Sequence, residues 1–132
     1  MYAELIRFVA GSGIRIDEAL HTDLDDVDED RGLLTITPKP GWTTKGYRYR
    51  DVPISTRTGE AAERFIELRD DHAMSDRVIW GRLQQARKAA ALPHLSMHDL
   101  RRAWASAVYA NGASLKQVSV WLGHADVATT ER

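Results

Sequence analysis

Apolar residues recur at helical spacing along most of this chain, and a single stretch that suits strands interrupts the pattern. Residues 33–37 (LLTIT) are rich in β-branched side chains, and residues 47–54 (YRYRDVPI) alternate aromatic or apolar with charged side chains, which is the period of a half-exposed strand. Pro38, Pro40 and Gly41 separate the two runs. These features predict a small antiparallel sheet at 33–54 within an otherwise helical chain.

Capping residues and apolar stripes place the helices. Ser96, with Asp99 three residues later, has the pattern of a capping box, Ser114 is suited to cap the next helix, and Gly123 is suited to end it. The expected helices cover residues 2–10, 15–21, 58–71, 79–91, 97–110 and 115–122, and a last one begins at Val127. The predicted fold class is mainly α with a small antiparallel sheet (α+β), in one domain of 132 residues.

Composition removes several classes of site. The chain has no cysteine, which excludes disulfides, thiol catalysis and Cys-based zinc sites. The acidic stretch at 23–30 lacks the glycine and the spaced glutamate of a calcium loop, so neither a metal ion nor another cofactor is expected. No apolar run of membrane-spanning length and no secretory signal is visible, so the expected location is the cytoplasm, away from membranes.

The net charge of −1 argues against nucleic-acid binding, but the charge is unevenly distributed. Residues 1–37 hold nine acidic side chains and three Lys/Arg, whereas residues 38–57 hold five Lys/Arg and one acidic side chain. Such runs are most often solvated faces. If the chain binds DNA, the expected contacts are Lys39, Arg48, Arg50 and Arg102, and the affinity should be modest and sensitive to salt.

His98 and Arg101 lie three residues apart on one predicted helix, so their side chains share a face, off the apolar stripe. Arg101 offers a planar set of donors that matches two phosphate oxygens, and His98 lies in the first turn, where free backbone N–H groups favour anions. Arg15, Lys45 and His124 are each ordinary when taken alone. Arg15, for example, could simply pair with Asp17, Glu18 or the acidic stretch.

The order of four blocks makes these residues informative together. They are SGIRIDEAL at 12–20, Lys45 followed by RDVPI at 50–54, HDLR at 98–101, and LGHADVATT at 122–130. In this order the blocks resemble the catalytic domain of the tyrosine recombinases, also called phage integrases. The resemblance runs from about residue 5 to the end, although residues 58–93 match only in general character.

The resemblance implies a role for each residue. Arg15 and Arg101 would clamp the scissile phosphate, His124 would donate to the same phosphate, and Lys45 would be the general acid for the leaving 5′ oxygen. His98 would accept a proton or donate to the phosphate, and Glu18 would support the Arg15 region. Phosphoryl transfer is catalysed mainly by positioning and by positive charge on the phosphoryl oxygens, so these residue types suit the reaction.

The chain also departs from the family pattern. Arg102 stands where a second histidine is usual, and Trp104 replaces a phenylalanine. The four tyrosines, Tyr2, Tyr47, Tyr49 and Tyr109, do not match the position of the family nucleophile, which is expected just after Arg132. Residues 1–132 are therefore expected to be a catalytic domain truncated at both ends, unable to cleave by itself and monomeric.

For the full-length protein, of bacterial or phage origin, the resemblance implies double-stranded DNA carrying a recombination site as partner, and a tetramer on that DNA. Strands would be cut and rejoined through a 3′-phosphotyrosine intermediate. Two alternatives stay open from the residues alone. One is a non-catalytic DNA-binding or regulatory protein of the same fold, and the other is a helical interaction module without a role on DNA.

Overall fold

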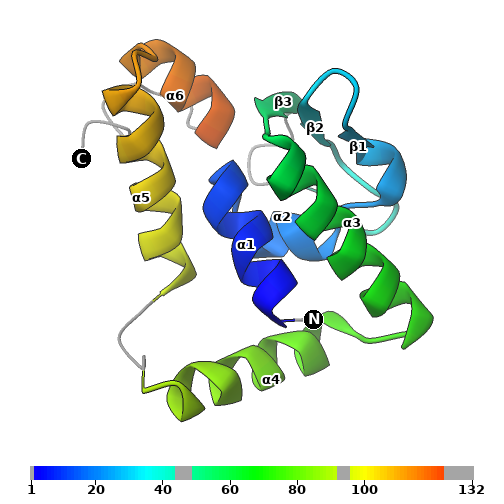
Figure 1. Ribbon diagram of the computed structural model, residues 1–132. Coiled ribbons are helices and arrows are strands. Elements are labelled where there is room, and N and C mark those ends of the chain that lie inside the picture. Colours follow the sequence, from blue (N-terminus) through cyan, green and yellow to red (C-terminus); the bar gives the residue numbers. More distant parts are fainter. Residues whose placement is uncertain (1, 44–48, 92–95, 124–132) are drawn as a thin grey trace.

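The computed structural model describes residues 2–43, 49–91 and 96–123, and these form a helical body with one small sheet (Figure 1). In chain order the elements are α1 (Tyr2–Ser12), α2 (Ile16–Leu20), the 3-10 turn η1 (Leu24–Asp26), β1 (Val27–Asp28), β2 (Leu33–Ile36), β3 (Arg50–Pro53), α3 (Thr56–Asp71), α4 (Asp76–Ala89), α5 (Met97–Ala110) and α6 (Leu115–Leu122). The predicted α+β class is confirmed. The helix predicted from Val127 lies outside the described residues.

Serine side chains set where four of the helices begin. The Ser96 hydroxyl accepts a hydrogen bond from the backbone N–H of Asp99 at 3.1 Å, as the sequence predicts. The Ser114 hydroxyl accepts one from the backbone N–H of Gln117 at the same distance. Ser55 and Ser75 cap α3 and α4 in the same way. Both of these helices therefore begin a few residues earlier than their apolar stripes suggest.

The sheet has the order β1–β2–β3 and is antiparallel throughout. Leu34 is paired with Val52, and Ile36 with Arg50, so Arg50 lies in register with buried apolar residues. Tyr49, its neighbour, is 64% exposed. The strand predicted at 47–54 is confirmed over Arg50–Pro53, while residues 47 and 48 lie outside the described residues. Arg50 lies on the buried face rather than the solvent face.

Helix α1 lies at the centre of the body, with α3 on one side and α5 on the other (Figure 1). Leu5, Phe8 and Val9 of α1 are fully buried together with Phe65 and Ile66 of α3. The turn after α1 packs directly on α5, because Gly13 has a φ of +70° and a Cβ atom there would overlap the Trp104 ring. This close approach brings the start of α2 beside the first turns of α5.

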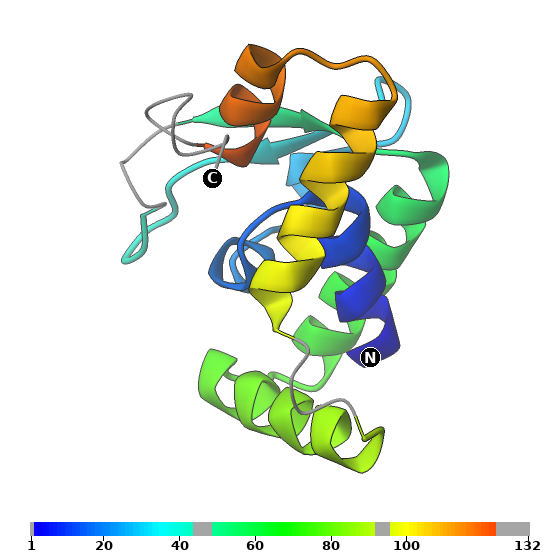
Figure 2. The ribbon, with the colours of Figure 1, turned by 90° about the vertical axis from the view of Figure 1, so that its left-hand side faces the viewer.

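Helix α4 lies across one end of the body, at the bottom of Figures 1 and 2. It buries Ile79 and Leu83, while Val78 and Trp80 remain 43% and 41% exposed. None of the helices in the described part of the chain is long and apolar enough to span a membrane. The peripheral place of α4 matters below, because its first turns face α2.

Candidate phosphate-binding site

Arg15, His98 and Arg101 line one pocket of about 370 Å³, although Arg15 is far from the other two in sequence. Arg15 lies at the N-terminus of α2, and His98 and Arg101 lie in the first turns of α5. The wall of the pocket also includes Trp80 of α4 and Asp17 of α2. The fold therefore brings together three of the five residues predicted to act on a phosphate.

Arg101 is held rigidly in this pocket. The residue is 4% exposed, and its Nη2 donates a hydrogen bond to the Leu122 carbonyl at the end of α6. Burial lowers the pKa of Arg101 to about 10, with the positive charges of Arg15 and Arg50 acting in the same direction and Glu18 opposing them. The Arg101 guanidinium is thus fixed by the Leu122 carbonyl, and more positive than negative charges surround it.

Arg15 is held through its backbone, which leaves its side chain available. Its backbone N–H donates to Glu18 Oε1 at 2.8 Å, which fixes the first turn of α2. Burial lowers the pKa of Arg15; the charge of Glu18 raises it and that of Arg50 lowers it further. Within residues 2–43, 49–91 and 96–123, the Arg15 guanidinium makes no hydrogen bond or ion pair.

Glu18 and Arg50 form a buried ion pair behind the pocket. Arg50 Nη1 and Nη2 donate to the two Glu18 carboxylate oxygens at 2.6 and 2.7 Å, and Arg50 Nε donates to the Trp121 carbonyl at 2.8 Å. Burial by itself raises the pKa of Glu18, but Arg50, together with Arg15, outweighs burial and holds it below its usual range. Gly123, at a φ of +76°, ends α6 against the Arg50 guanidinium, where a Cβ would come within 2.9 Å of Nη1.

This arrangement suits an anion. Three guanidiniums interact electrostatically with a single carboxylate, and the hydrogen bonds of that carboxylate are taken by Arg50 and the Arg15 backbone. Partly buried like charges repel one another, and a bound anion relieves that repulsion. The first turn of α5, which carries His98, adds the positive end of a helix dipole.

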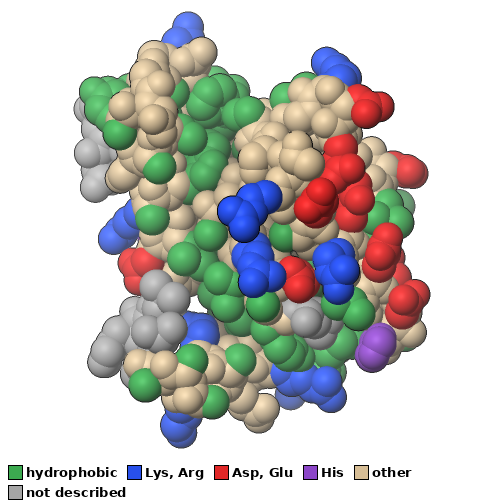
Figure 3. Space-filling model, in the orientation of Figure 1, with side chains coloured by type: hydrophobic (Ala, Val, Ile, Leu, Met, Phe, Trp, Pro, Cys, Tyr) green, Lys and Arg blue, Asp and Glu red, His purple; other side chains and the backbone are tan. Residues whose placement is uncertain are grey.

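Positive and negative side chains are interspersed on one face of the molecule (Figure 3). On the face shown in Figure 3, Lys and Arg side chains lie among Asp and Glu side chains, and the acidic ones gather on the side of α3 and the sheet. The net charge of −1 agrees with this picture. An anion in the pocket would therefore be held by the donors of the pocket itself and not by a broad basic field on this face (Figure 3).

Comparison with known proteins decides the family. The model of the phage integrase family matches residues 1–132, the whole chain. The chain belongs to the phage integrase family. Its relatives include a tyrosine recombinase XerC of Azotobacter vinelandii, 30% identical over 141 residues, and a tyrosine recombinase XerD of Brucella suis, 30% identical over 146 residues. Each alignment covers 96% of this chain and 45% of the relative, so the chain spans less than half the length of these recombinases.

Solved structures of a recombinase and an integrase have the same fold. A XerA recombinase superposes with a TM-score of 0.70 at 23% identity, covering 98% of this chain and 55% of that one. The catalytic domain of bacteriophage HP1 integrase superposes with a TM-score of 0.68 at 23% identity, covering 98% and 71%. At this identity the likeness shows the fold alone, and it agrees with the fold predicted from the sequence.

In this integrase-family chain the residues expected to contact DNA fall into three groups. Lys45, Arg48 and His124 lie outside the described residues. Arg102 is exposed on α5, as a DNA contact requires. Lys39 and Arg50 are instead engaged within the protein: Lys39 Nζ lies 2.6 Å from Asp26 Oδ2 and 3.1 Å from Asp23 Oδ2, and Arg50 is buried against Glu18. The placement of Arg50 on a DNA-facing surface is corrected accordingly.

Two features of the site were not predicted. The sequence gives Glu18 a supporting role but does not show that its partner is Arg50, because alternation in a strand ordinarily places charged residues outside. The sequence also gives no indication that Trp80 borders the site. A tryptophan beside a buried isoleucine in a helix carries no local signal that it borders a site formed by other helices.

Proposed function

We propose that this chain is the catalytic domain of a tyrosine-type site-specific DNA recombinase, with Arg15, Arg101 and His98 holding the scissile phosphate. The observation that carries the proposal is the pocket lined by the buried Arg101, the half-buried Arg15 and His98. Within the described residues, neither arginine forms an ion pair with a carboxylate. Members of the fold support DNA as the partner. A XerH site-specific recombinase was solved bound to its difH substrate, and a Tn1549 transposon integrase was solved with transposon right-end DNA.

In the proposed reaction, a tyrosine hydroxyl attacks the phosphorus and the bond to the 5′ oxygen breaks. Lys45 gives a proton to the leaving 5′ oxygen, and a 3′-phosphotyrosine remains. Arg15 and Arg101 donate to the non-bridging oxygens, where negative charge accumulates, and His124 contributes a further donor. His98 accepts the proton that the tyrosine hydroxyl loses. Rejoining reverses these steps with the 5′ hydroxyl of a second strand.

The nucleophile in this proposal is a tyrosine outside residues 1–132, just after Arg132, since none of the four tyrosines present matches the family position. The full-length enzyme is proposed to act as a tetramer on duplex DNA in the cytoplasm, where its substrate is, and the 132-residue chain to be a monomer that does not cleave. A stable dimer of this chain in light scattering would contradict the last point.

The decisive test uses the gene with its flanking coding sequence and a suicide DNA substrate that carries the recombination site. The expected product is a covalent protein–DNA adduct that is lost in a Tyr→Phe variant of the nucleophile and in Arg101→Ala. Arg31→Ala is the matched control, because it removes an exposed positive charge from the β1–β2 turn. A DNA site that is bound without any adduct would favour the non-catalytic alternative.

The 132-residue chain permits a simpler test of the clamp. Binding to duplex DNA should weaken about tenfold or more in Arg15→Ala and Arg101→Ala, since each removes a phosphate contact, and should fall with added salt. Arg31→Ala should bind nearly as the wild type does. Equal binding by all four proteins would remove the pocket from the proposed DNA interface and leave an interaction module without a role on DNA.

A further inference from the structure

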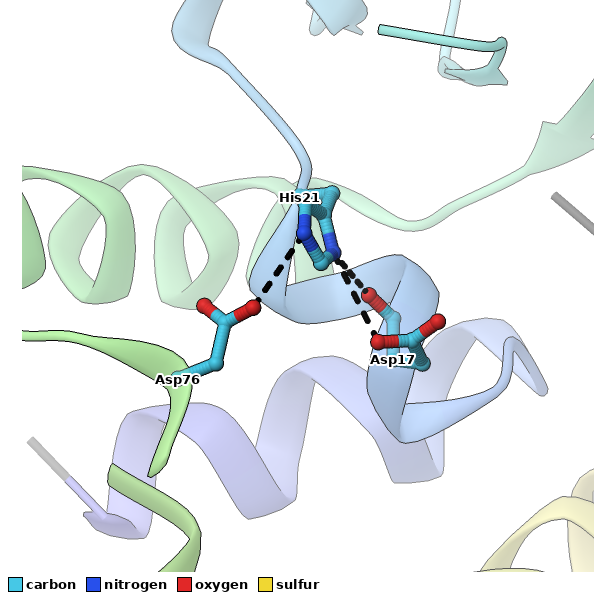
Figure 4. A group of neighbouring side chains, drawn as sticks. All are labelled: Asp17, His21 and Asp76. Atoms are coloured by element: carbon cyan, nitrogen blue, oxygen red, sulfur yellow. Dashed lines mark hydrogen bonds and ion pairs between the residues drawn. The ribbon is translucent and has the colours of Figure 1, made fainter. Parts of the chain in front are cut away.

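Three potential metal ligands meet between α2 and α4, beside the phosphate pocket but with a different arrangement of groups. Asp17 and His21 lie four residues apart on α2 and its C-cap, and Asp76 lies in the first turn of α4 (Figure 4). One ligand atom of each side chain lies within 4.8 Å of the other two. Neighbours in the helix thus converge with a residue from a distant part of the chain.

The hydrogen bond made by one ring nitrogen of His21 leaves the other ring nitrogen facing Asp76. Nδ1 lies 2.8 Å from the backbone carbonyl oxygen of Asp17, and because a carbonyl only accepts, Nδ1 carries the proton and donates. Nε2 lies 3.2 Å from Asp76 Oδ2. A nitrogen lone pair directed at a carboxylate is repulsive, and a metal ion between Nε2 and Asp76 would relieve that repulsion.

Trp42 holds both partners on α2 in place. Its Nε1–H donates to Asp17 Oδ2 at 2.8 Å, and its ring stacks on the His21 ring with centroids 4.2 Å apart and planes 5° from parallel. The His21 side chain is 22% exposed, against 63% for Asp17 and 50% for Asp76. Metal-binding histidines typically donate their other ring nitrogen to a carbonyl or carboxylate, and ligating carboxylates are hydrogen-bonded in turn. Both features are present here.

We propose that Asp17, His21 and Asp76 form a site for a first-row divalent transition-metal ion such as Zn²⁺. His21 provides Nε2, the two aspartates provide one oxygen each, and water completes the coordination. Bonds of about 2.0–2.2 Å require the ligand atoms to come closer than they lie now. Asp76 and Asp17 Oδ1, which now lies 3.6 Å from His21 Nδ1, move toward the ion as it binds, while Asp17 Oδ2 keeps its hydrogen bond to Trp42. One imidazole and two carboxylates favour such an ion over Mg²⁺, which prefers oxygen ligands alone.

The site would tie together the elements that border the phosphate pocket. Asp17 lies two residues after Arg15 and lines the pocket itself, and Asp76 lies on the same helix as Trp80. An ion here would fix α4 against α2. The binding of the ion is independent of the proposed recombinase activity, because none of its three ligands is assigned to the phosphate.

The experiment titrates ZnCl₂ into the 132-residue chain by calorimetry at pH 7.5, where free imidazole is neutral. One zinc ion per chain is expected, with affinity reduced at least tenfold in His21→Gln and in Asp76→Asn. His72→Gln is the matched control, since His72 is an exposed histidine at the C-cap of α3, and it should bind zinc as the wild type does. Trp42→Phe, which keeps a stacking ring but loses the hydrogen bond to Asp17, should weaken zinc about tenfold.

A second measurement avoids variants altogether. In ¹⁵N spectra of the wild-type imidazoles, zinc should shift the His21 Nε2 resonance at one equivalent and leave that of His98 in place. No zinc binding, or binding that survives in His21→Gln and falls in His72→Gln, would overturn the site. A His21 ring that takes up only a proton, with no response to zinc, would show that a proton is the cation between Nε2 and Asp76.

Discussion

Arginines serve opposite purposes on the two sides of the Glu18 carboxylate. On one side, Arg50 is buried, and its Nε, Nη1 and Nη2 are all hydrogen-bonded to Glu18 and the Trp121 carbonyl. On the other side, Arg15 and Arg101 face a pocket, and neither forms an ion pair within the described residues. The first region is closed and holds the fold together, while the second keeps donors available for an anion.

The two regions are physically linked, because the closed one positions the open one. Arg50 and Arg101 bind the neighbouring carbonyls of Trp121 and Leu122, the last residues of α6, and Glu18 fixes the backbone of Arg15. These carbonyls lack helical partners, and a cation beside them is favoured by the helix dipole. The ion pair thus helps to set the place of Arg15, of Arg101 and of the C-terminus of α6.

The largest effect is expected when the closed region is broken. Glu18→Ala leaves Arg50 buried without a counter-charge, and it should reduce the free energy of unfolding by about 3–5 kcal/mol, as measured by urea denaturation. Arg15→Ala, the comparison variant, removes a charge from the open region and should cost much less. A loss below about 1 kcal/mol in Glu18→Ala would mean that water reaches the pair and that the region is not closed.

Acid should weaken the same ion pair. The pKa of Glu18 is lower in the folded chain than its usual value of 4.5, so the pair stabilises the fold above that pH and the contribution is lost as the pH falls through the lower folded value. Unfolding free energies measured from pH 7 down to pH 3 should therefore fall more steeply below pH 4.5 in the wild type than in Glu18→Gln. Parallel curves would show that Glu18 is not the group responsible.

The open region should respond to an anion rather than to acid. Inorganic phosphate at ten times its dissociation constant should stabilise the wild type by about 1.4 kcal/mol, relative to chloride at equal ionic strength. Arg15→Ala and Arg101→Ala should lose this gain because each removes a donor, whereas Arg31→Ala should keep it. An equal gain in every variant would indicate a general salt effect instead of binding in the pocket.

The sequence predicts the local features of these two regions well, but it predicts the contacts between distant elements poorly. The capping pair Ser96 and Asp99 and the apolar stripes give the helices, and Arg15, His98 and Arg101 are found from their sequence blocks. The inward position of Arg50 could not be predicted from alternation, because its burial depends on a carboxylate that lies on another element. Likewise His21 meets Asp76 only after α4 has packed, and no sequence spacing encodes that contact.

Lys39 provides the smallest expected effect. The sequence predicts that Lys39 contacts DNA, whereas in the structure its ammonium group is paired with Asp26 and Asp23. Burial alone lowers the pKa of Lys39, but its hydrogen bonds to Asp26 and Asp23 outweigh burial and raise it. Its side chain is 19% exposed and Asp23 is more exposed still, so Lys39→Met should cost about 1 kcal/mol or less. Duplex DNA affinity should stay within about twofold, whereas Arg102→Ala, which removes an exposed charge from α5, should lower it. If Lys39→Met weakens DNA binding as much as Arg102→Ala does, Lys39 must break its ion pairs with Asp23 and Asp26 and contact the DNA phosphates instead.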